Sequence, residues 1–165
     1  MREMRLHKRE IRDPETVREI LDECDVVRLG TRDGEGMFIV PVNYGYELSE
    51  KADGQRLTLF IHGAGEGRKA DAFDACRDVA VELDCRHGII TGDYTCSYSY
   101  SYRSIMGNGR IHVLTEKEKQ IHALTKIMEH MAPDAEICFR PEMLERTAVF
   151  CIDVEDFTGK ERKKK

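Results

Sequence analysis

The sequence predicts a mainly β protein, a small antiparallel β-barrel with helices packed on its outside. Three observations favour this class. Apolar residues alternate with polar ones in several short runs, as they do in half-buried strands. Hairpin signals or short links join consecutive runs. Only a few stretches have helical spacing. At 165 residues the chain is expected to form a single domain over 1–165.

The first element is an expected helix over residues 13–24. Asp13 is a favoured N-cap, Pro14 suits the first helical position, and Glu15 adds negative charge to the first turn. The apolar residues that follow at helical spacing are Val17, Ile20, Leu21 and Cys24. This amphipathic stripe predicts a helix that packs against the barrel. The barrel itself is expected over residues 26–154.

Two strands are expected next, over residues 26–31 and 37–46. The Asp33-Gly34 pair between them is a hairpin signal. Pro41 lies inside the second strand and has no N–H to donate to a neighbour. It therefore indicates an edge or a bulge, where backbone is left free to meet a ligand.

The stretch from Arg56 to Lys69 is the most informative in the chain. A strand over 56–62 is followed by glycines at every second position and then by a short helix over 66–76. Glycine backbone, a helix start and two basic side chains (Arg68 and Lys69) together suit a phosphate. The same residues also fit a solvated strand-to-helix turn.

A strand over 78–85, a loop over 87–93 and a long strand rich in tyrosine come next. Tyr98, Tyr100 and Tyr102 fall on one face of that strand. They fit plain strand propensity, or an aromatic wall that faces a ligand or a subunit boundary.

The last elements are two helices and a strand. Thr115 and Glu118 form a capping-box pattern at the start of a long helix that Pro133 ends. A short helix is expected over 141–146, a final strand over 148–154, and a polar tail over 155–165.

The composition narrows the class of partner. The net charge of −5 argues against a general nucleic-acid binder. No apolar run reaches the length of a membrane span, and the charged N-terminus lacks the apolar core of a signal peptide, so a cytoplasmic protein without membrane contact is expected. None of the six cysteines forms C-x-x-C, so reduced thiols and no metal are expected.

Four segments, in the same order, resemble the pyridoxamine 5′-phosphate oxidase-related flavoproteins, and most closely the branch named for nitroimidazole-resistance (Nim) proteins. They cover residues 40–46, 59–69, 102–110 and 152–160. The resemblance implies a six-stranded antiparallel FMN-binding split barrel that forms a homodimer, with the flavin in a groove at the subunit boundary. Many relatives carry a tryptophan within the segment that matches 95–100, and this chain has none.

The resemblance also implies a role for particular residues. Arg68 and Lys69 would hold the FMN phosphate, and Arg103 and Ser104 would complete the site from this chain or its partner. The residues implied along the isoalloxazine edge and in the same groove are Val40, Pro41, Val42, Asn43, His62, Gly63 and Ala64.

Three functions remain open from the sequence. The first is an oxidoreductase that passes electrons from a reduced nicotinamide to a small organic acceptor, a nitro compound being one candidate. His62 would deliver a proton there, or make only a structural hydrogen bond. The second is a non-catalytic flavin- or haem-binding dimer, with His62 or His87 as the axial ligand of haem. The third is a dimeric module whose tyrosines serve assembly.

Overall fold

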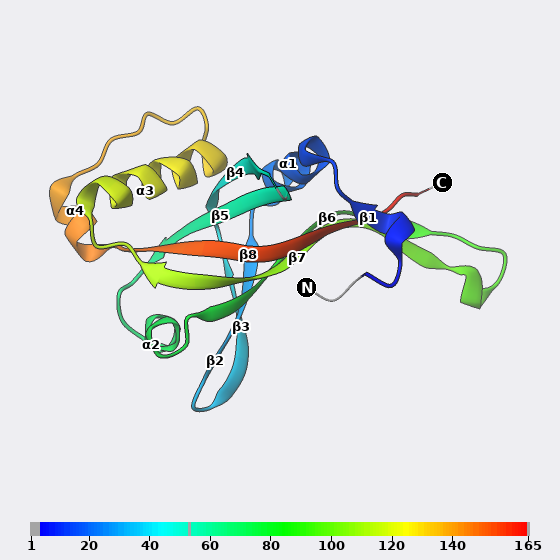
Figure 1. The fold of residues 1–165 in the computed structure, drawn as a ribbon, viewed down its shortest axis with the longest axis horizontal. Coiled ribbons are helices and arrows are strands. Elements are labelled where there is room, and N and C mark those ends of the chain that lie inside the picture. The colour runs from blue at the N-terminus through cyan, green and yellow to red at the C-terminus, as the bar shows by residue number, and fades with distance from the viewer. Residues whose placement is uncertain (1–3, 53, 165) are drawn as a thin grey trace.

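The computed structural model describes residues 4–52 and 54–164 of the chain (Figure 1). One 3-10 turn, η1 (His7–Arg9), precedes the first strand, and another, η2 (Thr95–Ser97), precedes β7. The α-helices are α1 (Pro14–Glu23), α2 (Arg68–Ala75), α3 (Lys117–Met131) and α4 (Pro141–Arg146). The strands are β1 (Glu10–Ile11), β2 (Val27–Asp33), β3 (Gly36–Val42), β4 (Gly45–Lys51), β5 (Gly54–Gly63), β6 (Asp78–Ile90), β7 (Ser99–Val113) and β8 (Ala148–Arg162).

All strands belong to one antiparallel sheet, in the order β3-β2-β6-β7-β8-β5-β4, with β1 paired to β8. The two ends of this path, β3 and β4, follow one another in the chain and are joined by Asn43 and Tyr44. They are not paired with each other, and this gap is the split in the barrel. The predicted antiparallel split barrel with helices outside is therefore confirmed.

The number of strands differs from the prediction, because the sheet has eight strands where six were expected. The expected strand over 37–46 is in fact two, since the chain leaves β2 after Val42 and crosses to β5 at Gly45. The short β1 adds the other strand. Alternation of side chains continues across the crossing, so the pattern alone did not reveal it.

The main core fills the inside of the barrel. Leu29 of β2, Val81 of β6, Ile105 of β7, Ile152 of β8 and Leu59 of β5 are all buried in one cluster. Burial of each such side chain stabilises the fold by about 1.5–3 kcal/mol. Because every long strand contributes to this cluster, the sheet is wrapped around a single apolar centre.

The helices α1 and α2 add to the same core. Ile20 and Leu21 of α1 are fully buried, as the predicted apolar stripe requires. Asp13 caps α1 by accepting a hydrogen bond from the Thr16 N–H at 2.8 Å, so the predicted helix start is confirmed. Phe73 of α2 packs edge-on against Phe150 of β8, with ring centres 5.5 Å apart.

Helix α3 packs on the outer face of the sheet (Figure 1). Ala123 and Ile127 of α3 form a second, smaller cluster with Phe60, Val149 and Cys151 of β5 and β8. The expected capping box at Thr115 was wrong. The helix begins two residues later, at Lys117, with Glu116 as an N-cap whose side chain makes no capping bond.

The C-terminal segment also differs from the prediction. The expected polar tail over 155–165 is strand as far as Arg162. Pairing of β8 with β5 stops at Val154, but β8 keeps β7 on one side and gains β1 on the other at Gly159 and Lys160. Similarly, β6 continues to Ile90 through much of the expected loop, and with β7 it forms an arm that extends beyond the barrel in Figure 1. Among the described residues, no helix has the length and apolar character needed to cross a membrane.

Candidate functional site

The candidate phosphate site lies where β5 gives way to α2. Strand β5 ends at Gly63, and α2 begins at Arg68 after a short glycine-rich link. Gly67 is the N-cap, with a φ of 93° that favours glycine, and it has no side chain to cap the helix. The first N–H groups of α2 are therefore available to an acceptor from outside the helix.

Lys69 lies over the end of β5. Its ammonium is so close to Gly63 that a Cβ on Gly63 would overlap the Lys69 Nζ, so a side chain at residue 63 would displace the end of Lys69 from this position. No described carboxylate lies within ion-pair distance of this ammonium. An uncompensated positive charge beside free N–H groups is what an anionic ligand requires.

His62 is half-buried next to this charge. Burial lowers the pKa of the imidazole below its ordinary value of 6.5, and the nearby Lys69 ammonium lowers the pKa further. The ring is therefore neutral near pH 7. A neutral imidazole can donate a hydrogen bond from one nitrogen and accept one at the other, which suits orientation of a ligand or movement of a proton.

Arg68 is engaged by another part of the chain. Its Nε and Nη2 donate to the two carboxylate oxygens of Asp33 at 2.6 and 3.2 Å, and its guanidinium lies 4.3 Å from the ring centre of Phe38. The hydrogen bond to Asp33, followed by the charges of Asp33 and Glu35, raises the pKa of Arg68. Arg68 thus ties the β2–β3 hairpin to the start of α2, a role that the sequence did not indicate.

The predicted isoalloxazine residues lie on and after β3. This is an edge strand, as Pro41 predicted, because it pairs only with β2. Val40 and Val42 are half-buried and Pro41 is exposed. Asn43 follows β3, and its side-chain amide contacts the sulfur of Met131 in α3.

Arg103 and Ser104 lie in a different part of the molecule, on β7 near α1. Both are buried. Arg103 donates to Glu19 of α1 at 2.5 Å and to Glu161 of β8 at 2.6 Å. These two carboxylates occupy the guanidinium within the chain, so the structure does not bring Arg103 together with Lys69.

A separate groove of about 1160 Å³ runs between α3 and the outer face of the sheet. None of the residues implied for the flavin lines it. Its lining includes His112, Cys151 and Asp153, which the sequence reasoning did not connect. Cys151 and Asp153 are two residues apart on the final strand, so the sequence already places them on one face. That His112 lies opposite Cys151 follows only from the register of β7 against β8.

The comparisons with known proteins agree with this fold. The family model of pyridoxamine 5′-phosphate oxidase matches residues 13–161. The chain belongs to this family. The match includes β5, the glycine-rich link and α2, so the candidate phosphate site is part of the shared region. No curated protein matches the sequence significantly.

Solved structures from three bacteria are similar to this member of the family. A Bacteroides thetaiotaomicron protein, described provisionally as a 5-nitroimidazole antibiotic resistance protein, is 26% identical with a TM-score of 0.76, over 92% of this chain and 86% of its own. The flavocytochrome Anf3 of Azotobacter vinelandii is 20% identical with a TM-score of 0.78, over 98% and 72%. An FAD- and haem-binding protein of Mycobacterium smegmatis is 16% identical with a TM-score of 0.78, over 94% and 74%. The last two likenesses concern the fold alone.

Proposed function

We propose that this protein binds FMN and transfers electrons from a reduced nicotinamide to a small organic acceptor. The flavin phosphate is held at the start of α2 by Lys69 and the first N–H groups of the helix. Membership of the pyridoxamine 5′-phosphate oxidase family supports a flavin site. The flavin-binding proteins among the structural neighbours are consistent with it.

The observation that carries the proposal is the uncompensated charge of Lys69 over Gly63. Arg68 takes a supporting part, because Asp33 already accepts two of its hydrogen bonds. A guanidinium has five N–H donors, so those not directed at Asp33 remain for a phosphate oxygen. Val40, Pro41 and Val42 of β3, with Asn43 directly after them, would provide an edge along which the flat ring system lies.

Bound FMN would supply hydride and electron transfer, while the protein binds and orients it. His62 is the group we assign to proton movement, since its neutral ring lies beside Lys69 and the end of β5. A nitro compound is a suitable acceptor, because the chain is similar to the Bacteroides protein that is provisionally described as a 5-nitroimidazole antibiotic resistance protein.

We also propose that the working unit is a homodimer. Met37 and Ile39 of the edge strand β3 are 87% and 67% exposed. Apolar side chains in a row on an edge strand favour contact with another chain. A second copy of the chain would cover these side chains.

The test is to release and identify the ligand. Purified protein should be yellow, and mass spectrometry of the denatured sample should find FMN rather than FAD or a deazaflavin. Lys69→Ala should lose most of the colour while Lys117→Ala, an exposed lysine on α3, keeps it. A colourless wild type that FMN does not restore would overturn the proposal.

A second candidate function is haem binding, which two structural neighbours carry out according to their names. His87 is the exposed candidate ligand on the β6–β7 arm, where its Nε2 lies 2.6 Å from Asp84 and its ring stacks on Tyr100. Because Asp84 engages Nε2, only Nδ1 is ready for iron. A Soret band on addition of haemin, lost in His87→Ala, would favour this function.

A further inference from the structure

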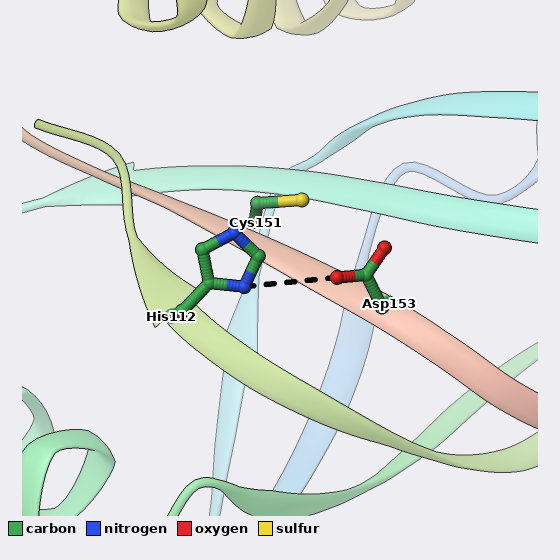
Figure 2. Close-up of side chains that lie close together, drawn as sticks. All are labelled: His112, Cys151 and Asp153. Atoms are coloured by element: carbon green, nitrogen blue, oxygen red, sulfur yellow. Dashed lines mark ion pairs between the residues drawn. The ribbon is translucent and has the colours of Figure 1, made fainter. Parts of the chain in front are cut away.

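Three potential metal ligands meet on the outer face of the sheet, in the groove beneath α3. His112 of β7 lies directly opposite Cys151 of β8, and Asp153 is two residues further along β8 on the same face. Their ligand atoms all lie within 4.8 Å of one another, and His112 Nδ1 is 3.7 Å from an oxygen of Asp153. Figure 2 shows the imidazole and the carboxylate facing each other across the strands, with the thiol beside them.

The spacing of these atoms is close to that of a tetrahedral zinc site. Bonds of about 2.0–2.3 Å to zinc place the ligand atoms roughly 3.3–3.8 Å apart. His112 has a side chain that is 42% exposed, so it is free to rotate by the small amount required. Cys151 is a free thiol held in place by the packing of α3 against β8.

Asp153 is already oriented for such a role. One of its oxygens accepts from Arg56 of β5 at 3.3 Å, and the other faces His112. Arg56 thus engages one oxygen of Asp153, while the other oxygen faces His112 and the Cys151 thiol lies beside the imidazole. A partner that fixes a ligand from behind is a regular feature of metal sites.

The groove leaves room for a further ligand. His122 of α3 lies 2.7 Å from Glu47 of β4, and both line the same hollow of about 1160 Å³ as the three ligands. Three protein ligands with an open position are typical of zinc sites that bind water or a small molecule.

We propose that His112, Cys151 and Asp153 form a binding site for a divalent transition metal, Zn²⁺ in particular, with its open position toward the groove. Imidazole and thiolate select Zn²⁺ over Mg²⁺ or Ca²⁺, which prefer oxygen ligands. This site is separate from the start of α2 and does not depend on flavin binding. The proposal differs from the expectation, based on cysteine spacing, that the chain binds no metal.

The test uses Co²⁺ as a spectroscopic probe for Zn²⁺ in the full chain, after treatment with a chelator. One equivalent of Co²⁺ should give thiolate-to-metal charge-transfer absorption, and Zn²⁺ should abolish it while Mg²⁺ does not. Cys151→Ser should remove that absorption, and His112→Ala should weaken binding by more than about 100-fold, the upper limit for loss of an outer-shell partner. The His112 side chain is 42% exposed and does not belong to either apolar core cluster, so this variant should fold.

The matched control is Cys138→Ser, because Cys138 is an exposed thiol outside the groove. It should bind Co²⁺ as the wild type does, and so should Lys69→Ala. Absence of charge-transfer absorption in the wild type would overturn the proposal. So would absorption that survives Cys151→Ser, or affinity that His112→Ala leaves unchanged.

Discussion

Lys69 and His62 influence each other through charge, and this coupling is a measurable property of the candidate site. The pKa of His62 is lowered first by burial and then by the ammonium of Lys69. A phosphate bound to Lys69 would screen that ammonium and add negative charge. The protonation of His62 therefore reports on what occupies the start of α2.

Lys69→Ala should raise the pKa of His62 toward 6.5, because it removes one of the two causes of the decrease. Addition of FMN to the wild type should also raise it. NMR titration of the imidazole signals measures both effects. In the absence of Lys69, FMN should have a smaller effect, and an unchanged titration of His62 in Lys69→Ala would show that the two groups do not interact.

Arg103 is a second residue whose environment makes a clear prediction. It is 8% exposed and is bound by Glu19 and Glu161. Arg103→Met should lower the free energy of unfolding by about 2 kcal/mol, since it leaves the partly buried Glu161 with only the exposed Lys163 as a partner. Urea denaturation measures this change. Arg12→Met, which removes an exposed arginine paired with Glu10, should have almost no effect, and equal losses in both variants would contradict the interpretation.

At the scale of elements, the contact of α3 with β4 shapes the outer face of the sheet. A Cβ on Gly45 would overlap the backbone of Lys126 and Ile127 in α3. The helix can approach β4 this closely only because residue 45 has no side chain. The same contact forms one wall of the groove that contains His112 and Cys151.

Gly45→Ala should therefore push α3 away from β4 and destabilise the fold by about 1–3 kcal/mol. Thermal denaturation followed by circular dichroism measures the loss. Gly34→Ala is the matched control, because a Cβ at Gly34 meets nothing within 4 Å. If the two variants melt together, the close approach of α3 is not a determinant of stability.

Some features of the helices and strands could be predicted from the sequence, and others could not. The cap at Asp13 and the edge position of Pro41 follow from local chemistry, and both were predicted correctly. The division at Asn43 and the extension of β8 to Arg162 were not predicted. Both features depend on which strands pair with β3, β4 and β8. These pairing partners include strands that are far away in the sequence, so local patterns do not reveal them.

Some features of the candidate site could likewise be predicted from the sequence, and others could not. The glycine link and Lys69 are contiguous in sequence, so their meeting was predictable from the motif. The pairing of Arg68 with Asp33 and the proximity of His112 to Cys151 join residues far apart in the chain. Only the sheet register and the β2–β3 hairpin bring these residues together.

For the whole molecule, the exposed side chains of β3 raise the question of assembly. Met37 and Ile39 lie on an edge strand with most of their surface open. As a homodimer, the protein should have twice the 19.0 kDa mass of the chain by light scattering. Ile39→Lys should yield monomer, because a charge in a buried apolar contact is costly. Glu155→Lys, at an exposed position of β8, should remain dimeric; a monomeric wild type would contradict the proposal.

The most direct test of the central claim compares the affinities of FMN and riboflavin, which differ only in the phosphate. If Lys69 and the start of α2 hold that phosphate, the wild type should bind FMN at least about tenfold more tightly, since a hydrogen bond to a charged group contributes about 1.5–3 kcal/mol. Lys69→Ala should reduce this preference, whereas Lys117→Ala should not. Equal affinity of the wild type for the two ligands, or a preference for FMN that survives Lys69→Ala, would contradict the account.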